Sequence, residues 1–313
     1  LHSAVHSFPT RRSSDLPHNL FTFISGIGCS SRFIYYMKTF GFHSVHGRAN
    51  AIATGVKTAN PRLNVWVTSG DGDSLAIGGN HFIHAIRRNI NLNAILFNNE
   101  IYGLTKGQYS PTSKLGKITK TSPYGTVEKP FNPGELVIGA KGTFFARSID
   151  MEVNLTKECL IAAAKHQGMS VTEVLQNCVI FNDKTHAAFA GDKATRLEHT
   201  ITLRHGEKML FGANNEKGLV FEDMRLKVVT VGQDGYTLDK ILTHDAHTKD
   251  TTLHSMLAAM KYPDYPVALG VIRSVEDEIV YDQAVEKQVE EVKAQSKIHC
   301  VDDLLHSGAT WEI

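Results

Sequence analysis

Short apolar runs alternate with helix-like patterns over the first half of the chain. Runs of four or five mostly apolar residues, the length of buried strands, cover 20–24, 65–68, 94–97, 143–147 and 171–175. The residue spacing between them predicts helices over 30–40, 49–58, 75–89 and 155–166. Strands separated by helices are typical of an α/β fold with a parallel sheet flanked by helices. Such sheets bind ligands at the carboxyl ends of their strands.

The second half of the chain has a weaker pattern. Residues 183–252 are polar, and short strand-like runs there are separated by turn signals at Gly206, Gly212, Gly232 and Gly235. Farther along, the spacing of Val285, Val289 and Val292 predicts a helix with one apolar side. We therefore expect an α/β domain over 17–182 and a less regular C-terminal extension over 183–313 packed on it.

Two segments depart from the alternation. Residues 1–16 have no period of 2 or 3.6, no initiating Met and no secretory pattern, so we expect a foreign or disordered tract outside the fold. Residues 105–132 form a long connection rich in Gly, Ser, Thr, Lys and Pro. A connection of this length inside a domain is usually functional or mobile.

The composition excludes several classes of protein. The 33 Lys and Arg against 32 Asp and Glu give a net charge of +1, too small to hold nucleic acid or an anionic membrane surface. Hydrophobic residues make up 42% of the chain, which is globular, and no apolar run reaches the roughly 18 residues of a membrane helix. Four scattered cysteines without a Cys-x-x-Cys pair form no disulfide scaffold, so we expect a soluble, cytoplasmic protein.

The strongest chemical signal follows the run 65–68. It is Ser69-Gly70-Asp71-Gly72-Asp73-Ser74, which leads into the next predicted helix. The glycines allow a sharp turn and a close approach of the backbone to a ligand, and a helix N-terminus suits phosphate. A carboxylate and a phosphate that lie side by side repel each other unless a cation lies between them. Mg²⁺ prefers such oxygen ligands.

A second polar strand end strengthens this interpretation. Gly-Asp-Gly alone is usually only a turn. The run 94–97, however, ends in Asn98-Asn99-Glu100-Ile101, and Asn99 follows Asp71 by 28 residues, about one helix and one strand. Adjacent parallel strands end side by side, so Asn99 can reach the same cation. We expect Mg²⁺ bound by Asp71, the Asn99 amide, a nearby backbone carbonyl, two diphosphate oxygens and a water.

Gly-Asp-Gly followed by Asn-Asn resembles the fingerprint of thiamine-diphosphate enzymes. Several longer segments are similar to the β subunit of 2-oxoacid:ferredoxin oxidoreductases, most of all to the 2-oxoglutarate branch: SGIGCSSR over 25–32, HGRA over 46–49, GNHFIHAIRRN over 79–89 and YGLTKGQYSPT over 102–112. The resemblance runs from Pro17 to the closing SGATW over 307–311. It implies a thiamine-diphosphate-binding domain of the pyrophosphate type.

The resemblance also implies the residues of the site. It assigns Mg²⁺ to Asp71, Asn99 and the carbonyl of Ile101. It implies cofactor contacts from Ile27, Gly28, Ser30, His46, Gly47, Gly72, Asp73, Gly103 and Leu104. Without the resemblance, the pattern of residues does not identify the contacts at 27–30 and His46. Lys106 and Ser110-Pro111-Thr112 lie in the adjacent loop, where a loop that closes over the substrate is expected. Lys106 could pair with a substrate carboxylate, but a solvated lysine is equally compatible with the sequence.

Members of this family hold one [4Fe–4S] cluster through four thiolates. Cys29 and Cys178 match two of these ligands, but the Cys-x-x-Cys that supplies the others is absent, and the tract 1–16 stands in its place. We infer that the authentic N-terminus is missing and expect the cluster to be absent or unstable. Cys159 and Cys300 are expected to be structural. The group His244, Asp245, His247 and His254 has no zinc-like spacing, and structural or surface roles are expected.

The implied reaction is the oxidative decarboxylation of a 2-oxoacid, 2-oxoglutarate first, with coenzyme A to acyl-CoA (succinyl-CoA), CO₂ and reduced ferredoxin. The glutamate that activates the cofactor is expected on a partner α subunit, so this chain alone should be inactive and should work in a heterodimer, or a doubled heterodimer. Pyruvate or a branched-chain 2-oxoacid remains an alternative substrate. A cofactor-binding subunit without an electron exit is an alternative of another class. A Rossmann-like nucleotide-binding module lacks its Gly-x-Gly-x-x-Gly.

Overall fold

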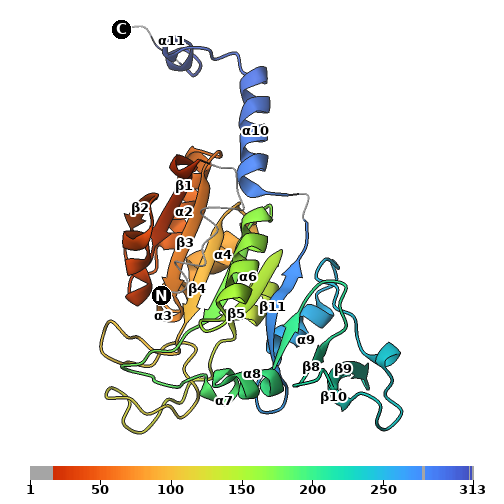
Figure 1. The fold of residues 1–313 in the computed structure, drawn as a ribbon. Coiled ribbons are helices and arrows are strands. Elements are labelled where there is room, and N and C mark those ends of the chain that lie inside the picture. The colour runs from red at the N-terminus through yellow and green to blue at the C-terminus, as the bar shows by residue number, and fades with distance from the viewer. Residues whose placement is uncertain (1–16, 277–278, 310, 312–313) are drawn as a thin grey trace.

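A computed structural model describes residues 17–276, 279–309 and 311 of the chain (Figure 1). The predicted tract 1–16 and part of the closing SGATW segment lie outside the described residues. None of the helices among the described residues is long and apolar enough to cross a membrane.

An eight-stranded sheet forms the centre of the molecule, in the order β2-β1-β3-β4-β6-β5-β11-β7. Neighbouring strands run parallel except for β5 and β11, which are antiparallel. The strands are β1 Phe21–Ser25, β2 Phe40–His43, β3 Asn64–Gly70, β4 Asn93–Asn98, β5 Phe144–Ile149, β6 Ser170–Leu175, β7 Thr200–Leu203 and β11 Val267–Ser274. The predicted α/β class with a mostly parallel sheet is confirmed.

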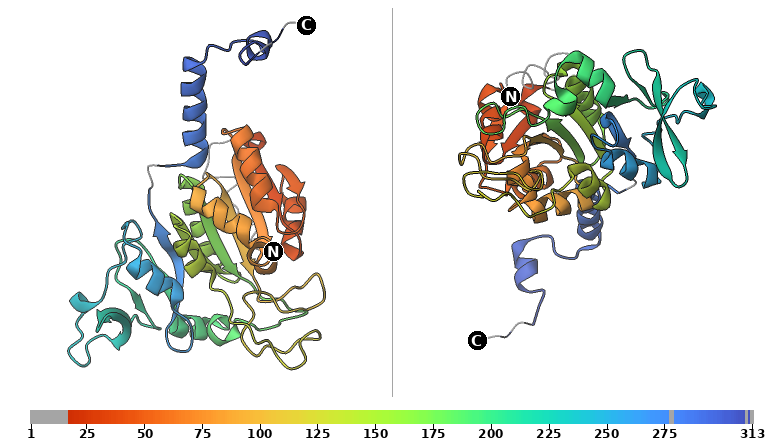
Figure 2. Two further views of the ribbon diagram at one scale, coloured as in Figure 1. Left: turned by 180° about the vertical axis from the view of Figure 1, so that it is seen from behind. Right: turned by 90° about the horizontal axis from the view of Figure 1, so that it is seen from below.

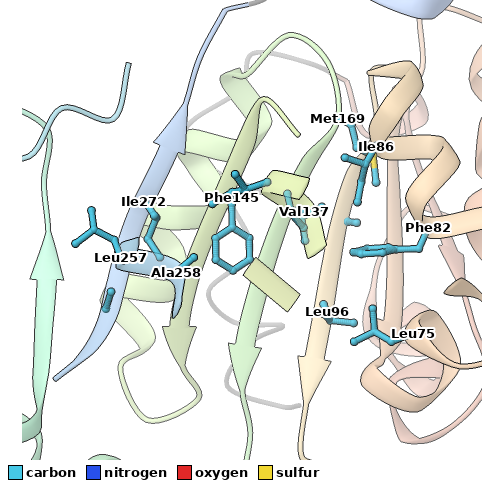
Figure 3. Packing of buried hydrophobic residues seen from close by; sticks show 14 of the residues in the cluster. Leu75, Phe82, Ile86, Leu96, Val137, Phe145, Met169, Leu257, Ala258 and Ile272 are labelled. Atoms are coloured by element: carbon cyan, nitrogen blue, oxygen red, sulfur yellow. The ribbon is translucent and has the colours of Figure 1, made fainter. Parts of the chain in front are cut away.

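Helices cover both faces of this sheet. On one face lie α2 (Ala49–Ala59), α4 (Gly79–Arg88), α5 (Pro133–Gly139) and α9 (Thr252–Ala259), whose apolar side chains share one buried cluster with the strands. Phe82, Val137, Phe145 and Leu257 show how this layer packs across the width of the sheet (Figure 3). On the other face, the 3₁₀ helix η2 (Cys29–Tyr36) and α6 (Val153–Lys165) pack in a second cluster.

Two predicted helices have different boundaries. The helix expected over 75–89 is broken: α3 covers Asp71–Leu75 and α4 begins at Gly79. The backbone leaves the helical region at Ala76, whose ψ is −103°, and the Gly78 N–H then donates to the Asp73 carbonyl at 3.1 Å. A Cβ at Gly78 would lie 2.4 Å from that carbonyl oxygen, so this turn requires glycine. The helix expected over 30–40 is instead the 3₁₀ helix η2, and its last predicted residue, Phe40, begins edge strand β2.

The C-terminal part both extends the sheet and adds a small layer of its own. The strands β8 (Leu210–Phe211), β9 (Lys217–Glu222) and β10 (Arg225–Thr230) form an antiparallel sheet, and the four predicted turn glycines all have positive φ. The short helices η1 (His18–Leu20), α7 (Ala187–Ala190), α8 (Lys193–His199) and η3 (Leu238–Lys240) complete the body. Because β7 and β11 join the main sheet, the segment after residue 182 is more than a peripheral extension; the domain boundary there stays a prediction.

The chain ends in a projecting arm, α10 (Tyr281–Gln295) and α11 (Val301–Leu305), which extends away from the body (Figures 1 and 2). Its base is anchored: the Asn91 N–H donates to the Asp282 carboxylate over 3.0 Å, and the buried Lys57 lies 4.0 Å from it. The predicted helix with an apolar side is present, but Val289 and Val292 are 44% and 62% exposed.

Candidate functional site

A cavity that is open to solvent lies at the carboxyl ends of β1, β3 and β4. The strand register explains why these loops meet. Ser25 pairs with Thr68, and Gly70 pairs with Phe97, so the three strands end at one edge of the sheet. Most predicted site residues line this cavity: Ile27, Gly28, Cys29, Ser30, His46, Asp71, Gly72, Asp73, Asn99, Ile101, Gly103 and Leu104. The long loop 105–132 lies at the same edge (Figure 1).

Asp71 is the buried carboxylate of the site. It is 2% exposed, and its Oδ2 accepts hydrogen bonds from the hydroxyls of Ser110 and Thr112. Burial raises the pKa of Asp71 to about 6, although these hydrogen bonds act in the opposite direction. Within the described part of the chain Asp71 forms no salt bridge. A divalent cation would favour its charged form, so this donor set fits Mg²⁺.

Asn99 and Ile101 belong to a loop whose shape is fixed by side chains from other segments. The Asn99 Oδ1 accepts the Ile101 N–H at 3.3 Å, and the Asn99 carbonyl accepts from Asn182 at 2.9 Å. Glu100, between them, has a φ of 54°, and its carbonyl accepts from Ser113 at 2.6 Å. Asn99 and Ile101 thus line the same cavity as Asp71, and their shared binding of one cation stays a prediction.

Asp73 ties three loops together. Its Oδ1 accepts the Gly47 N–H at 2.8 Å and lies 3.5 Å from His46 Nδ1, while its Oδ2 accepts the Ser69 hydroxyl at 2.5 Å. Gly47 itself does not line the cavity. The structure therefore gives Gly47 the role of holding Asp73; the direct cofactor contact implied for it stays a prediction.

Gly26 and Tyr102 are residues that the sequence reasoning missed. A Cβ at Gly26 would lie 1.8 Å from the Asp73 carboxylate, and a Cβ at Gly72 would lie 2.2 Å from the Tyr102 ring. The Tyr102 hydroxyl donates to the Gly72 carbonyl at 2.9 Å, and burial together with the two aspartates raises the pKa of Tyr102 to about 12. Both lie inside the quoted segments 25–32 and 102–112, and this is the signal that could have identified them.

Ser30 and Gly28 have features that suit a bound ligand: an unpaired hydroxyl and open space beside the backbone. Ser30 is one of the residues that line the cavity, and its hydroxyl is buried without a hydrogen-bond partner among the described residues. Buried polar groups are rarely unpaired, so this one fits the diphosphate of a bound cofactor. Gly28 has a φ of 116°, and a Cβ there would meet nothing within 4 Å. Both features agree with the contacts implied for these positions.

The two predicted thiol ligands converge at Gly103. A Cβ on this glycine would lie 3.4 Å from the Cys29 Sγ and 3.7 Å from the Cys178 Sγ. Burial and the nearby Cys178 raise the pKa of the Cys29 thiol. Among the described residues, however, no three His, Cys, Asp or Glu side chains could hold one metal ion. Two thiols meet here, which is an incomplete set for a [4Fe–4S] cluster.

Other predicted polar residues lie elsewhere. Cys159 is buried in α6, and Cys300 caps α11. The histidines at 244, 247 and 254 bond to backbone carbonyls, which is structural, as expected. Lys106 is exposed and does not line the cavity. Ser110 and Thr112, expected in a closing loop, are instead buried against Asp71.

Three comparisons relate the chain to known proteins. Residues 26–174 match the family described as thiamine pyrophosphate enzyme, C-terminal TPP binding domain. The 2-oxoglutarate oxidoreductase subunit KorB of Mycobacterium tuberculosis is 47% identical over 93% of this chain and 78% of that protein. The 2-oxoglutarate synthase subunit KorB of Archaeoglobus fulgidus is 50% identical over 50% of this chain and 58% of that protein. A 2-oxoglutarate:ferredoxin oxidoreductase structure from Magnetococcus marinus aligns with 99% of this chain and 90% of its own, with a TM-score of 0.75 and 26% identity.

Proposed function

Because the chain belongs to the family of β subunits of 2-oxoglutarate:ferredoxin oxidoreductases, we propose that the cavity at the ends of β1, β3 and β4 holds the thiamine diphosphate of this enzyme. The enzyme converts 2-oxoglutarate and coenzyme A into succinyl-CoA and CO₂ and passes the released electrons to ferredoxin. The observation that carries the proposal is the buried, desolvated Asp71 beside the amide-bearing loop of Asn99.

Each residue of the cavity has a distinct task in this proposal. Asp71, Asn99 and the Ile101 carbonyl would hold Mg²⁺ against the diphosphate, since hard oxygen ligands suit this ion. Ser30 would donate its unpaired hydroxyl to the cofactor, and Gly28 lets the backbone approach it closely.

The remaining predicted contacts would enclose the cofactor and orient it. They are Ile27, His46, Gly72, Asp73, Gly103 and Leu104, all of which line the cavity. When bound, thiamine diphosphate supplies the carbon that adds to the keto group and takes up the electrons left as CO₂ departs. The protein contributes binding, charge neutralisation and orientation.

A partner α subunit completes the enzyme in this proposal. It would supply the activating glutamate, which is expected outside this chain, and the assembly would be a heterodimer or its doubled form. Ferredoxin, coenzyme A and the 2-oxoacid are the remaining partners, and Lys106 is a candidate contact for a substrate carboxylate. We propose a cytoplasmic location, where thiols and reduced ferredoxin persist.

The test is a calorimetric titration of thiamine diphosphate into the complex of this chain with its α subunit. We expect binding that requires Mg²⁺, and a loss of roughly 100-fold or more in affinity for Asp71→Asn, because a metal site loses a charged ligand. Asp234→Asn, at an exposed turn, is the matched control and should bind as the wild type does. Metal-independent binding, or an unaffected Asp71→Asn, would contradict the proposal.

The choice of 2-oxoacid has its own test. Formation of the coenzyme A thioester by the complex, compared among 2-oxoglutarate, pyruvate and a branched-chain 2-oxoacid, should give the highest kcat/KM for 2-oxoglutarate. A higher value for either of the others would overturn this part of the proposal.

A second candidate role is favoured by the cysteine set. The 313 residues contain four cysteines, of which Cys29 and Cys178 converge while Cys159 and Cys300 lie apart from them. We propose that these residues alone bind thiamine diphosphate without a complete [4Fe–4S] cluster, and therefore lack an electron exit. Iron and acid-labile sulfide should be well below four per chain; a full complement with visible Fe–S absorbance would contradict this.

A further inference from the structure

We propose that Thr112 and Ser110 are positioning residues for the metal site, because their hydroxyls hold the carboxylate of Asp71 in one orientation. The inference rests on the metal role of Asp71 proposed above and extends it to the long loop 105–132. Neither residue is among those that line the cavity, and both contact Asp71, so we infer that they act through Asp71.

The geometry is that of a clamp on one carboxylate oxygen. The Ser110 hydroxyl donates to Asp71 Oδ2 at 2.5 Å, and the Thr112 hydroxyl donates to the same oxygen. Among the described residues, Oδ1 takes no side-chain hydrogen bond. Both hydroxyl-bearing residues are buried, with exposures of 2% and 5%, so water does not compete for these contacts. One oxygen is therefore fixed, and the other is left for a cation.

The clamp is itself supported by a buried polar chain across the sheet. The Thr112 Oγ1 also lies 3.0 Å from Asn98 Oδ1, but its single hydrogen serves only one of the two acceptors, Asp71 or Asn98. The Asn98 amide donates to Glu173 Oε1 at 2.7 Å. Arg147 donates through Nε to Glu173 Oε2 at 2.6 Å and through a terminal nitrogen to Asn132 Oδ1 at 3.1 Å. The hydrogen bonds that join Asn98, Glu173, Arg147 and Asn132 are buried or nearly so, which makes a rigid base against which the Thr112 side chain packs.

The same network holds both ends of the loop. Asn132, at its far end, caps α5 by accepting the Gly134 N–H at 3.0 Å and also accepts from Arg147. Thr112, near its start, reaches Asn98 and Asp71. The loop is thus tied to the sheet at both ends, and the orientation of a metal ligand depends on one of these ties.

Removing the clamp should weaken metal binding without removing the ligand. Mg²⁺ demands near-ideal octahedral geometry, so a carboxylate that is free to rotate binds it less well. Partners that orient a metal ligand typically contribute 10- to 100-fold in metal affinity. A hydrogen bond to a charged group corresponds to a similar factor.

The experiment measures metal affinity directly. Mn²⁺, which accepts the same oxygen ligands, is titrated into the complex of the chain with its α subunit in the presence of thiamine diphosphate, and free Mn²⁺ is followed by electron paramagnetic resonance. Thr112→Val removes the hydroxyl at constant size, and Thr112→Ser keeps it. Thr126→Val is the control: its hydroxyl is in the same loop, equally buried, but donates to the Lys114 carbonyl at 2.9 Å.

We expect Thr112→Val to weaken Mn²⁺ binding roughly 10- to 100-fold, with Thr112→Ser and Thr126→Val within about threefold of the wild type. Ser110→Ala gives an independent comparison if Thr112→Val does not fold. Wild-type affinity in both Thr112→Val and Ser110→Ala, or equal losses in Thr112→Val and Thr112→Ser, would overturn the inference. Failure of the wild type itself to bind Mn²⁺ with thiamine diphosphate would instead contradict the proposed function.

Discussion

Replacing Gly26 by alanine should destabilise the loops that carry the site. Gly26 follows β1, and its N–H donates to the Thr68 carbonyl at 2.8 Å, which fixes its position. A Cβ there would lie 1.8 Å from Asp73 Oδ2 and 2.8 Å from its carboxyl carbon. Non-bonded atoms do not approach this closely, so either the strand end or the carboxylate must move.

The magnitude follows from what Asp73 would lose. To bring the Oδ2 contact from 1.8 to 3.0 Å, the closest approach that a real Cβ tolerates, the carboxylate must shift by 1.2 Å. That shift breaks the hydrogen bonds from the Gly47 N–H and the Ser69 hydroxyl. A hydrogen bond to a charged group contributes about 1.5–3 kcal/mol, so the two together cost about 3–6 kcal/mol. This is a large part of the free energy of unfolding of a typical protein, which is about 5–15 kcal/mol.

Urea denaturation of the chain measures this directly as a change in the free energy of unfolding. Gly55→Ala is the matched control, because Gly55 lies exposed in α2 and a Cβ there would meet nothing within 4 Å. We expect Gly26→Ala to lose about 3–6 kcal/mol and Gly55→Ala to gain about 0.5–1 kcal/mol. A Gly26→Ala protein within about 1 kcal/mol of the wild type would refute the reasoning, since Asp73 would then be free to move.

Two further predictions concern buried titratable side chains away from the cavity. Arg147→Met should cost about 3–5 kcal/mol by urea denaturation, because it leaves Glu173 charged and uncompensated in the sheet; a loss below about 1 kcal/mol would contradict this. Burial lowers the pKa of His166 to about 4. The imidazole of the unfolded chain is protonated near pH 6.5, whereas in the folded protein it stays neutral down to about pH 4. As the pH is lowered from 6.5 to 4, this residue therefore reduces the free energy of unfolding by about 3 kcal/mol. His166→Gln should remove that part of the pH dependence, and an unchanged slope between these pH values would argue against it.

The central strands could be predicted because their runs are mostly apolar. In a sheet covered on both faces, side chains on both sides of a strand are buried, so hydrophobicity marks β3 and β4, and it marks β6 in spite of its buried Thr172 and Glu173. The same topology made the meeting of Asp71 and Asn99 predictable. Once two parallel strands are neighbours, the residues that follow their ends must lie at one edge.

The clamp on Asp71 could not be predicted in this way. Ser110 and Thr112 are 39 and 41 positions from Asp71, and no periodic pattern connects a loop to the strand end on which it packs. The break between α3 and α4 was hidden for another reason: Ala76 and Ile77 fit a helix locally, and the non-helical ψ of Ala76 leaves no signal in the pattern of residues. Edge strand β2 lacks a buried face, so its hydrophobic signal is weak.

The strand order also bears on how the protein folds during synthesis. The strands β1 to β6 are neighbours of one another and are contributed by residues 21–175, whereas β11 reaches the sheet only after the polar segment that carries β8, β9 and β10 has been made. Chains emerge from the ribosome at about 5–20 residues per second, and N-terminal units generally fold first. The walls of the cavity can therefore assemble several seconds before the antiparallel strand covers the exposed edge of β5. During that interval β5 is an open edge, and a nascent chain in this state is the one that most needs protection from aggregation.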